Sequence, residues 1–403
     1  MKKVKIEDLD CFISDGNYSS KYPKSTEFLK EGIPFIRCNN FKNNSIVKED
    51  MYYISEKKHA ELLKGHLKTG DVLITTRGSL GQVAIVPKEF DDANINAQIV
   101  LLRPNPNKIF NKYLMWCLKS KNVQKQILQN KTGTALQQLP VGKLKKIEIC
   151  ICEDLEKQEE IVRKLDNIER IINLKQWQLY SINELIKSQF VEMFGDPILN
   201  PMKWEVKKLK DISNKIMSGN TPKGGDRVYV SSGIEFYRSQ NVWKNRIEKD
   251  DIAYIDEETH KNMLKSSLKH NDLLITKTGR INTENSSLGR TAIYTGEDDK
   301  ANINGHIYLV RLNEGENHEF VLRILISDRY REHIRKVCVG GIDKRQLNKE
   351  HIEDFPIIYP PKRMQKEFTD KVKQIDKQKF EIQKSLEETQ KLKESLMNKY
   401  FGG

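Results

Sequence analysis

The sequence has no long apolar run and no paired cysteine motif. No apolar stretch approaches the roughly 18 residues that a membrane-spanning helix needs, and the opening "MKKVKIEDLD" lacks the apolar segment of a signal peptide. The six cysteines form no C-x-x-C pair, and most lie in apolar stretches, where a free thiol behaves as a small hydrophobic group. We therefore expect a cytoplasmic protein in a reducing compartment, without a zinc site and without a membrane partner.

Motifs of autonomous catalysis are missing as well. The sequence contains no H-E-x-x-H, no G-x-S-x-G, no G-x-G-x-x-G after a strand and no Asn/Asp-Pro-Pro-aromatic run. Ser218–Arg227, "SGNTPKGGDR", has the glycine spacing of a phosphate loop, but Gly225 and Asp226 stand where Lys and Ser/Thr are required, so we interpret it as a turn-rich loop. The expectation is a chain with no catalytic residue, no bound cofactor and no metal ligand; an enzyme with a degenerate site is an alternative.

Positive charge exceeds negative charge. Lys and Arg number 69 against 56 Asp and Glu, which gives a formal net charge of +13. A surplus of this size suits a polyanionic partner, nucleic acid before membrane. A lysine-rich background composition explains the same number, so charge alone does not decide the function.

What the sequence does contain is an internal duplication. For example, "IPFIRCNNFKNNSI" is followed 201 positions later by "IEFYRSQNVWKNRI". Three blocks recur in the same order, with offsets of 201, 201 and 208 positions, at Ile33–Ile46 and Ile234–Ile247, at His59–Thr75 and His260–Thr276, and at Ser79–Arg103 and Ser287–Arg311. A duplicated chain can place two similar but non-identical binding surfaces on one molecule.

Each copy begins with a globular part that mixes strands and helices. Runs rich in Val, Ile and Leu and bounded by Gly, Pro or Asn predict strands. These runs are Val72–Gly78, Val83–Pro87 and Ala97–Pro104, and in the second copy Leu273–Gly279, Thr291–Gly296 and His306–Leu312. A helix is expected over Asn111–Gln129 and another near Glu319–Val337. We therefore predict an α+β fold with two similar globular domains and a pseudo-twofold internal repeat.

Each copy ends in a long helix with an apolar heptad seam. Apolar residues recur at spacings of four and three, and the second segment repeats the register of the first with an offset of 207. The seam residues are Ile161, Leu165, Ile168, Ile172, Leu179, Ile182 and, in the second helix, Phe368, Val372, Ile375, Ile382 and Leu386. Gly195 and Gly402 are expected to cap the two helices. About 40 helical residues span roughly 60 Å, and a stripe this narrow needs a partner.

The matched helices are therefore predicted to pair as an antiparallel coiled coil, with the globular domains at opposite ends. Folding of each helix back on its own domain is the alternative. The predicted domain boundaries are 1–152 for the first globular domain, 153–196 for the first helix, 197–360 for the second globular domain and 361–403 for the second helix.

Three matched sets of polar residues are candidates for contact with nucleic acid. The loop after the central strand offers Gly for close backbone approach, Arg or Lys for phosphate or guanine, and Gln or Asn for adenine. The segment before each long helix, Thr132–Ile149 and Gly340–Ile357, and the residues after "IPFI" and "IEFY" are the other sets, for which turns, caps or buried hydrogen bonds are competing interpretations. The candidates are Arg37, Asn39, Asn40, Thr76, Arg77, Ser79, Gln82, Gln137, Gln138, Thr221, Lys223, Arg238, Gln240, Asn241, Lys277, Thr278, Arg280, Asn282, Lys344 and Arg345.

The chain resembles the specificity subunit of type I restriction–modification enzymes. The resemblance rests on "SGNTPKGG" at the start of the second domain and on the "D-x-L-I-T…G…G" core at Asp71–Gly81 and Asp272–Gly289. It rests further on "QLP" at Gln138–Pro140 and "QLN" at Gln346–Asn348, and on the two helices that end in "FG". Each motif alone is loose, whereas their duplicated order along the whole chain is specific.

This resemblance implies a DNA-binding scaffold without catalysis of its own. Each globular domain would be a target recognition domain that reads one half of a split, asymmetric site in double-stranded DNA. The helices would space the two halves and dock two adenine-methyltransferase subunits, and two motor-nuclease subunits would join for cleavage. S-adenosylmethionine, ATP and Mg²⁺ would be used by those partners and not bound by this chain. A coiled-coil adaptor whose basic surface meets a protein partner, without sequence-specific DNA reading, is the alternative function.

Overall fold

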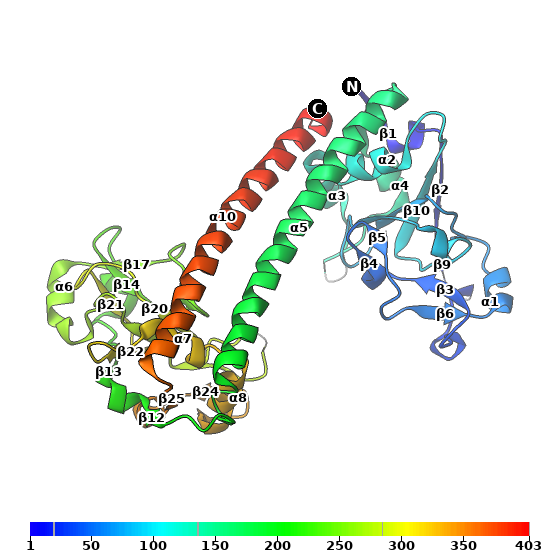
Figure 1. Ribbon diagram of the computed structural model, residues 1–403. Coiled ribbons are helices and arrows are strands. Elements are labelled where there is room, and N and C mark those ends of the chain that lie inside the picture. Colours follow the sequence, from blue (N-terminus) through cyan, green and yellow to red (C-terminus); the bar gives the residue numbers. More distant parts are fainter. Residues whose placement is uncertain (19–20, 135–136, 284, 403) are drawn as a thin grey trace. The chain divides into compact units, whose positions relative to one another are not determined.

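The structure is a computed structural model that describes residues 1–18, 21–134, 137–283 and 285–402 (Figure 1). The chain divides into two compact units: Met1–Trp177 with Ile382–Gly403, and Gln178–Glu381. Both mix helix and sheet, and the order of their elements is repeated, as the internal duplication predicts. The division falls within the two long helices, and the predicted domain boundaries stay predictions.

A four-stranded antiparallel sheet forms the centre of each unit. Its strand order is β2-β10-β7-β8 in the first unit and β13-β22-β18-β20 in the second. The bounds are Cys11–Asp15 (β2), Ile99–Pro104 (β10), Val72–Thr75 (β7) and Val83–Ile85 (β8), then Ser213–Ser218 (β13), Ile307–Leu312 (β22), Leu273–Thr276 (β18) and Thr291–Ile293 (β20). The strands predicted from the apolar runs are confirmed, and β7 and β18 are buried along their whole length, as central strands should be.

Two polar residues of the repeated blocks, Asp71 and Arg103, form an ion pair. Asp71, just before β7, is 1% exposed and holds Arg103 of β10 through two hydrogen bonds, from Nε to Oδ1 and from Nη2 to Oδ2, each 2.7 Å long. Asp272 and Arg311 form the same pair in the second unit. A bidentate pair fixes the geometry of both partners, so the aspartate of the D-x-L-I-T core holds neighbouring strands together.

Smaller sheets surround each central sheet. The first unit has β6-β3-β9, β1-β11 and β4-β5; the second has β17-β14-β21, β12-β25, β15-β16 and β19-β24-β23. The bounds are Lys2–Lys5 (β1), Ile33–Ile36 (β3), Phe41–Lys42 (β4), Ser45–Ile46 (β5), Tyr52–Ile54 (β6), Asn94–Ile95 (β9), Glu148–Ile151 (β11), Val206–Lys208 (β12), Ile234–Tyr237 (β14), Val242–Trp243 (β15), Arg246–Ile247 (β16), Ala253–Ile255 (β17), Thr278–Arg280 (β19), Ala301–Ile303 (β21), Val339–Gly340 (β23), Lys344–Gln346 (β24) and Pro356–Ile358 (β25).

The prediction of one helix after each central sheet is wrong in one respect, because two helices lie in each stretch. These are α2 (Asn111–Leu118) and α3 (Lys121–Asn130), and α7 (His318–Leu325) and α8 (Asp328–Val337). Ser120 and Ser327 interrupt the stretch, since each serine hydroxyl accepts a hydrogen bond from a backbone N–H of the next helix and so caps its N-terminus. Short helices α1 (Glu56–Glu61), α4 (Val141–Lys145), α6 (Glu257–Asn262) and α9 (Lys349–Glu353) complete the globular parts.

Two helices of equal length follow, α5 (Leu155–Phe194) and α10 (Lys362–Phe401). Gly195 ends α5 with a φ of +76°, a left-handed conformation that glycine adopts without strain, as predicted. Gly402 instead donates its backbone N–H to the Asn398 carbonyl and does not adopt a positive φ. The predicted left-handed cap is therefore found at the first helix and not at the second.

In the first unit, the start of α5 lies beside the end of α10. Lys175 Nζ donates to Ser385 Oγ (2.6 Å) and Thr389 Oγ1 (2.8 Å), and Lys393 forms an ion pair with Glu169. In the second unit, the end of α5 lies beside the start of α10, and the rings of Phe190 and Phe194 lie 5.5 and 5.6 Å from that of Phe368. In each unit the two segments therefore run in opposite directions.

The apolar stripe of the helices is wider than the narrow seam predicted. Ile161, Val162 and Leu165 belong to the core of the first globular part, together with Met397 and Phe401 of α10. Phe368 and Val372 likewise belong to the core of the second. Of the other seam residues, Ile168, Ile172 and Leu386 are buried, and Leu179, Ile182, Ile375 and Ile382 are half-buried. In each unit the helix ends thus pack on the globular part of that unit as well as on each other.

All six cysteines lie in the described part of the chain and are free thiols. Over the same residues, no helix combines the length and the apolar character that crossing a bilayer requires.

Candidate nucleic-acid interface

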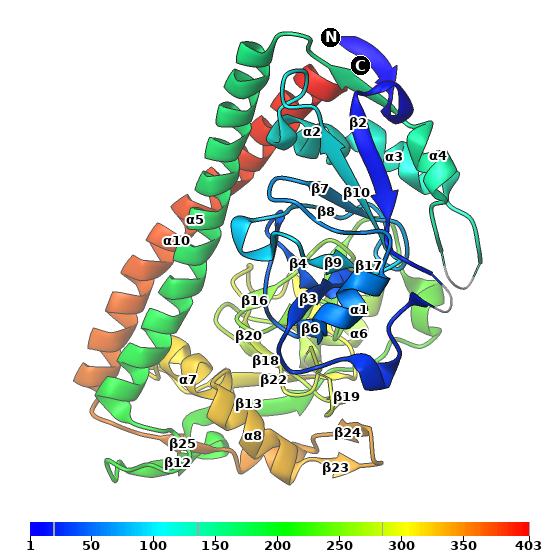
Figure 2. The ribbon, with the colours of Figure 1, turned by 90° about the vertical axis from the view of Figure 1, so that its right-hand side faces the viewer.

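The structure brings two of the predicted sets together in both units. In the second unit, β19 of the loop after the central strand pairs with β24 of the segment before α9, with Arg280 opposite Lys344 and Thr278 opposite Gln346. β23 pairs with the other edge of β24, beside α8 (Figure 2). We call this three-stranded sheet the loop cluster of the second unit. It combines segments that are far apart in the sequence.

The first unit has a smaller version of the same arrangement. Arg77 and Gln138 form an isolated bridge, and the backbone N–H of Leu139 donates to the carbonyl of Thr76 over 2.8 Å. Arg77 also lies over the ring of Tyr18, 5.1 Å from its centre. We call these residues the loop cluster of the first unit. Residues 135, 136 and 284, which fall in the predicted segments, lie outside the described residues.

A glycine explains why the second cluster is compact. A Cβ atom on Gly279 would lie 2.3 Å from the backbone nitrogen of Leu288, so no side chain fits at this point of β19. The absence of a side chain lets the strand approach Ser287 and Leu288 closely. Gly279 therefore fixes the position of the strand that carries the neighbouring Arg280.

Exposure separates the predicted residues into three groups. The exposed side chains are Asn39, Ser79, Gln82, Gln137, Thr221, Lys223, Gln240, Arg280, Asn282 and Lys344. The half-buried ones are Arg37, Arg77, Gln138, Arg238, Lys277, Thr278 and Arg345, and the buried ones are Asn40, Thr76 and Asn241. Thr221 and Lys223 lie on the loop after β13 and not in the loop cluster.

The third matched set has structural roles. Asn40 Oδ1 accepts from the Arg37 backbone N–H and its Nδ2 donates to the Glu49 carbonyl, and Asn241 makes the equivalent bonds in the second unit. Arg37 and Arg238 each donate to a loop carbonyl over 2.6 Å. Because these polar groups are used inside the protein, we leave the two asparagines and the two arginines out of the proposed interface.

Thr76 is left out for the same reason. Its hydroxyl is buried and donates to the Gln98 carbonyl over 3.1 Å, which ties the end of β7 to the turn before β10. Of the third set, Asn39 and Gln240 remain exposed, and the Gln240 side-chain amide donates to Asp251 Oδ2 over 2.8 Å.

A cavity beside the loop cluster of the second unit is lined by two arginines. It has a volume of about 330 Å³ and is lined by Gln240, Trp243, Arg280 and Arg290, among others. Arg290 stacks on Trp243, with its guanidinium carbon 3.8 Å from the ring centre. Burial, followed by the positive charge of Arg331, lowers the pKa of Arg290. Cations gathered so closely favour an anionic partner.

Trp243 and Arg290 are not among the residues predicted from the sequence. Trp243 lies inside the first repeated block and Arg290 inside the third, so both were in view as parts of the duplication. In "NVWKNR" an aromatic residue stands beside Lys244 and Arg246, so basic residues cluster there.

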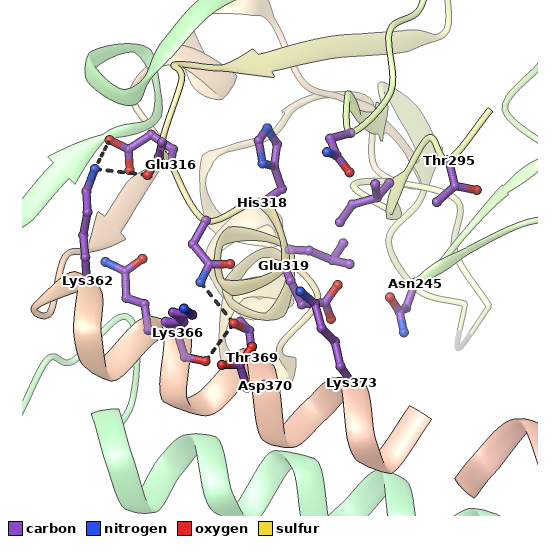
Figure 3. Close-up of a pocket in the computed structure, with 16 residues that line it drawn as sticks. Asn245, Thr295, Glu316, His318, Glu319, Lys362, Lys366, Thr369, Asp370 and Lys373 are labelled. Carbon is purple, nitrogen blue, oxygen red and sulfur yellow. Dashed lines mark hydrogen bonds and ion pairs between the residues drawn. The ribbon is translucent and has the colours of Figure 1, made fainter. Parts of the chain in front are cut away.

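A second feature is repeated and was not predicted. Each unit has a groove of about 610 Å³ between the long helix and the globular part, and Figure 3 shows that of the second unit. Equivalent positions line the two grooves: Asn44 and Asn245, Ile85 and Ile293, Met115 and Leu322, Asp166 and Lys373. In Figure 3, Lys362 pairs with Glu316. Asn317 Nδ2 donates to Thr369 Oγ1 over 3.2 Å. Both signs of charge line this groove, so it suits a protein surface better than a phosphate backbone.

Two units of one plan, each with a polar loop cluster built from two distant segments, define a duplicated recognition protein. The family model for the type I restriction modification DNA specificity domain matches residues 1–184 and again 201–394. The chain therefore belongs to the family of type I restriction–modification specificity subunits, with two target-recognition domains. Subunits of this family are DNA-recognition components and are not themselves enzymes.

Individual relatives agree with this assignment. The MjaVIII specificity subunit of a type I restriction enzyme from Methanocaldococcus jannaschii is 21% identical over 96% of this chain and 87% of its own length. The crystal structure of a type I S subunit from M. genitalium covers 99% of this chain and 96% of its own, with a TM-score of 0.57 and 17% identity. A chain from a structural study of type I complex assembly and conformational transition matches with a TM-score of 0.59, 17% identity and coverage of 99% and 97%. At these identities the solved structures bear on the fold alone.

Proposed function

We propose that this chain reads a split, asymmetric site in double-stranded DNA, one half with each globular domain. The observation that carries the proposal is the loop cluster, which is present in both units but built from different side chains. Arg77 lies opposite Gln138 in the first unit, and Thr278 lies opposite Gln346 at the equivalent place of the second unit, which adds Arg280 opposite Lys344. The same scaffold with different donors and acceptors is what two readers of different base sequences require.

The exposed polar residues divide by chemistry. Arg280, Lys344 and Lys223 supply phosphate contacts, which give salt-dependent affinity without sequence information. Gln82, Gln137 and Asn282 are exposed amides that pair with base edges, adenine above all. Affinity and base choice thus come from different side chains.

The two long helices are proposed to pair along their length as an antiparallel coiled coil and so to set the distance between the half-sites. Opposite chain directions in each unit support this, as do the polar contacts of Lys175 with Ser385 and Thr389 and of Lys379 with Asn183. A polar residue within an apolar seam specifies register. A fixed register is what a spacer of constant length needs.

The repeated grooves are proposed docking sites for two adenine-methyltransferase subunits, and motor-nuclease subunits complete the assembly for cleavage. Two equivalent grooves of about 610 Å³ on the long helices suit two copies of one partner. S-adenosylmethionine, ATP and Mg²⁺ belong to these partners in this proposal, which leaves recognition to the present chain.

Exchange of one globular domain tests the proposal. Residues 1–149 are replaced by the corresponding segment of another specificity subunit that keeps an aromatic residue at position 113, since the Tyr113 ring packs 5.4 Å from that of Phe401. Strand-resolved mapping of adenine methylation in cells with the complete system should show one half-site changed and the other retained. A change in both halves contradicts modular recognition, and methylation without sequence preference favours the adaptor function.

A further inference from the structure

Three side chains that could ligate a metal converge in the first unit. They are His59 on α1, His66 in the segment before β7, and Asp92 in the turn before β9. His59 Nε2 lies 3.3 Å from Asp92 Oδ2, and His66 Nδ1 lies 3.9 Å from Asp92 Oδ1. Together the three ligand atoms lie within 4.8 Å of one another.

Each imidazole ring makes a contact through the nitrogen that points away from Asp92, and this contact fixes which nitrogen of the ring faces Asp92. His59 Nδ1 contacts Asn94 Oδ1, and His66 Nε2 contacts the Leu62 carbonyl at 2.5 Å. Both partners are acceptors only, so these two nitrogens carry the protons. In the neutral form of both rings, the other two nitrogens, Nε2 of His59 and Nδ1 of His66, present lone pairs toward the Asp92 carboxylate.

We propose that His59 Nε2, His66 Nδ1 and the carboxylate of Asp92 bind a divalent transition-metal ion, with zinc as the preferred ion. Two imidazole lone pairs and a carboxylate repel one another, and a metal ion between them removes this repulsion without protonation of either ring. Two nitrogens and one oxygen form a donor set that suits zinc. Carbonyl acceptors behind each ring are the outer contacts that metal-bound histidines typically make.

The distances need only a small adjustment. Zinc ligands at about 2.0–2.1 Å from the metal in a tetrahedron lie roughly 3.3–3.4 Å from one another, and the gap between His59 and Asp92 already has this length. The His59 side chain is 15% exposed and that of Asp92 is 71% exposed. The open side leaves room for a water molecule as fourth ligand.

The second unit holds the same scaffold without the second histidine. His260, Ser267 and Asp299 occupy the equivalent places, and Ser267 Oγ donates to Asp299 Oδ1 over 2.8 Å. Asn302 Nδ2 donates to the Met263 carbonyl over 3.0 Å and lies 3.3 Å from His260 Nδ1. A complete hydrogen-bond network therefore replaces the proposed metal site.

The first unit has His66 where the second has Ser267, and its hydrogen bonds differ accordingly. His66 Nε2 contacts the Leu62 carbonyl, which is equivalent to the Met263 carbonyl that Asn302 contacts in the second unit, and the Asn94 side-chain oxygen faces His59. As a result Asn94 Nδ2 is buried without a hydrogen-bond partner. A bound ion that holds both rings in place offsets this loss.

The ion is proposed to have a structural role. It ties α1 to the turn before β9, and β9 pairs with β3 in the sheet β6-β3-β9. Zinc should therefore stabilise the first unit and leave the second unchanged, and the proposal does not depend on which DNA sequence is read.

Metal binding by the full-length chain, without an affinity tag and stripped with a chelator, tests the proposal. Co²⁺ serves as the spectroscopic probe, and Zn²⁺ is added in thermal unfolding. One Co²⁺ per chain, with the intense visible absorption of a tetrahedral site, and a higher melting temperature with Zn²⁺ are expected. His66→Ser, which copies the second unit, should lose both signals.

Two further variants keep the test decisive. Asp92→Asn retains the side-chain size and tolerates the φ of +59°, so it should fold and bind Co²⁺ at least tenfold more weakly. His270→Ala removes an exposed histidine of the second unit and should bind like the unaltered chain. Equal Co²⁺ binding by the unaltered chain and His66→Ser would overturn the proposal. Stabilisation that depends on pH but not on Zn²⁺ would also overturn it, because a proton would then hold the three groups together.

Discussion

Removal of two cations from the second loop cluster should change how DNA binding depends on salt. The variant is Arg280→Gln with Lys344→Gln, which lie opposite each other in adjacent strands. Both side chains are exposed, and Arg280 pairs with Asp343 over 3.3 Å at the surface. Exposed pairs contribute about 0–1 kcal/mol, so the variant should fold normally.

The expected magnitude follows from the number of phosphate contacts. Each contact contributes roughly 0.9 to the slope of log K against log salt concentration, so loss of two makes the slope less steep by about 1.8. Between 50 and 200 mM salt, the binding constant of the unaltered protein should therefore fall about 12-fold more than that of the variant.

The assay is a titration of duplex DNA with the chain assembled with the proposed methyltransferase partner, at four or more salt concentrations. The control is Lys265→Gln with Lys300→Gln, which removes the same charge from exposed positions of the same unit outside the loop cluster. If the control changes the slope as much as the test variant, general charge and not the cluster meets the phosphates. An unchanged slope in the test variant would refute the assignment of these cations to the DNA backbone.

Three other predictions concern the helices and the second unit. Insertion of four residues in both long helices lengthens each by about 6 Å. At roughly 3.4 Å per base pair, methylome sequencing should then show the two half-sites about two base pairs further apart. An unchanged distance between the half-sites contradicts the proposal that the helices set it. Lys175→Leu should raise the melting temperature, because the charge that donates to Ser385 and Thr389 is replaced by an apolar group in the seam; a lower temperature would show that these bonds outweigh burial. Burial lowers the pKa of His318 and of His333 in the folded protein, so the unfolded chain binds more protons below about pH 6.5. Stability, measured as the urea midpoint, should therefore fall as the pH drops from 7 to 5. The variant His318→Gln with His333→Gln should lose part of this pH dependence, and an unchanged dependence would contradict the assignment to these two histidines.

The repeated blocks made the fold predictable. Central strands such as β7 and β18 are continuous apolar runs, and long segments without Pro or Gly could only be helices. The duplication then doubled each signal. By contrast, Ser120 and Ser327 each divide a predicted helix, because the side chain of each caps the N-terminus of the following helix. From the sequence alone, such a serine cannot be told from one inside a continuous helix.

The site was less predictable, because it depends on contacts between distant segments. Nothing in "TKTGRIN" or "IDKRQLN" indicates that Thr278–Arg280 and Lys344–Gln346 form adjacent strands. Asn40 and Asn241 show the opposite problem: their amides suit DNA by type, yet both are used inside the protein. The group of His59, His66 and Asp92 has no sequence motif, since its members come from three separate segments.

The helix α10 has a consequence for the order in which this protein acquires its structure. Met397 and Phe401 lie in the core of the unit that begins at residue 1, and the Phe401 side chain is 1% exposed there. The ribosome makes that unit first, but the residues that close its core are among the last to be synthesised. While the second unit is being translated, the apolar surface of Tyr113 and its neighbours stays uncovered. The emerging chain should therefore depend on chaperones longer for its N-terminal half than for the half that is made later.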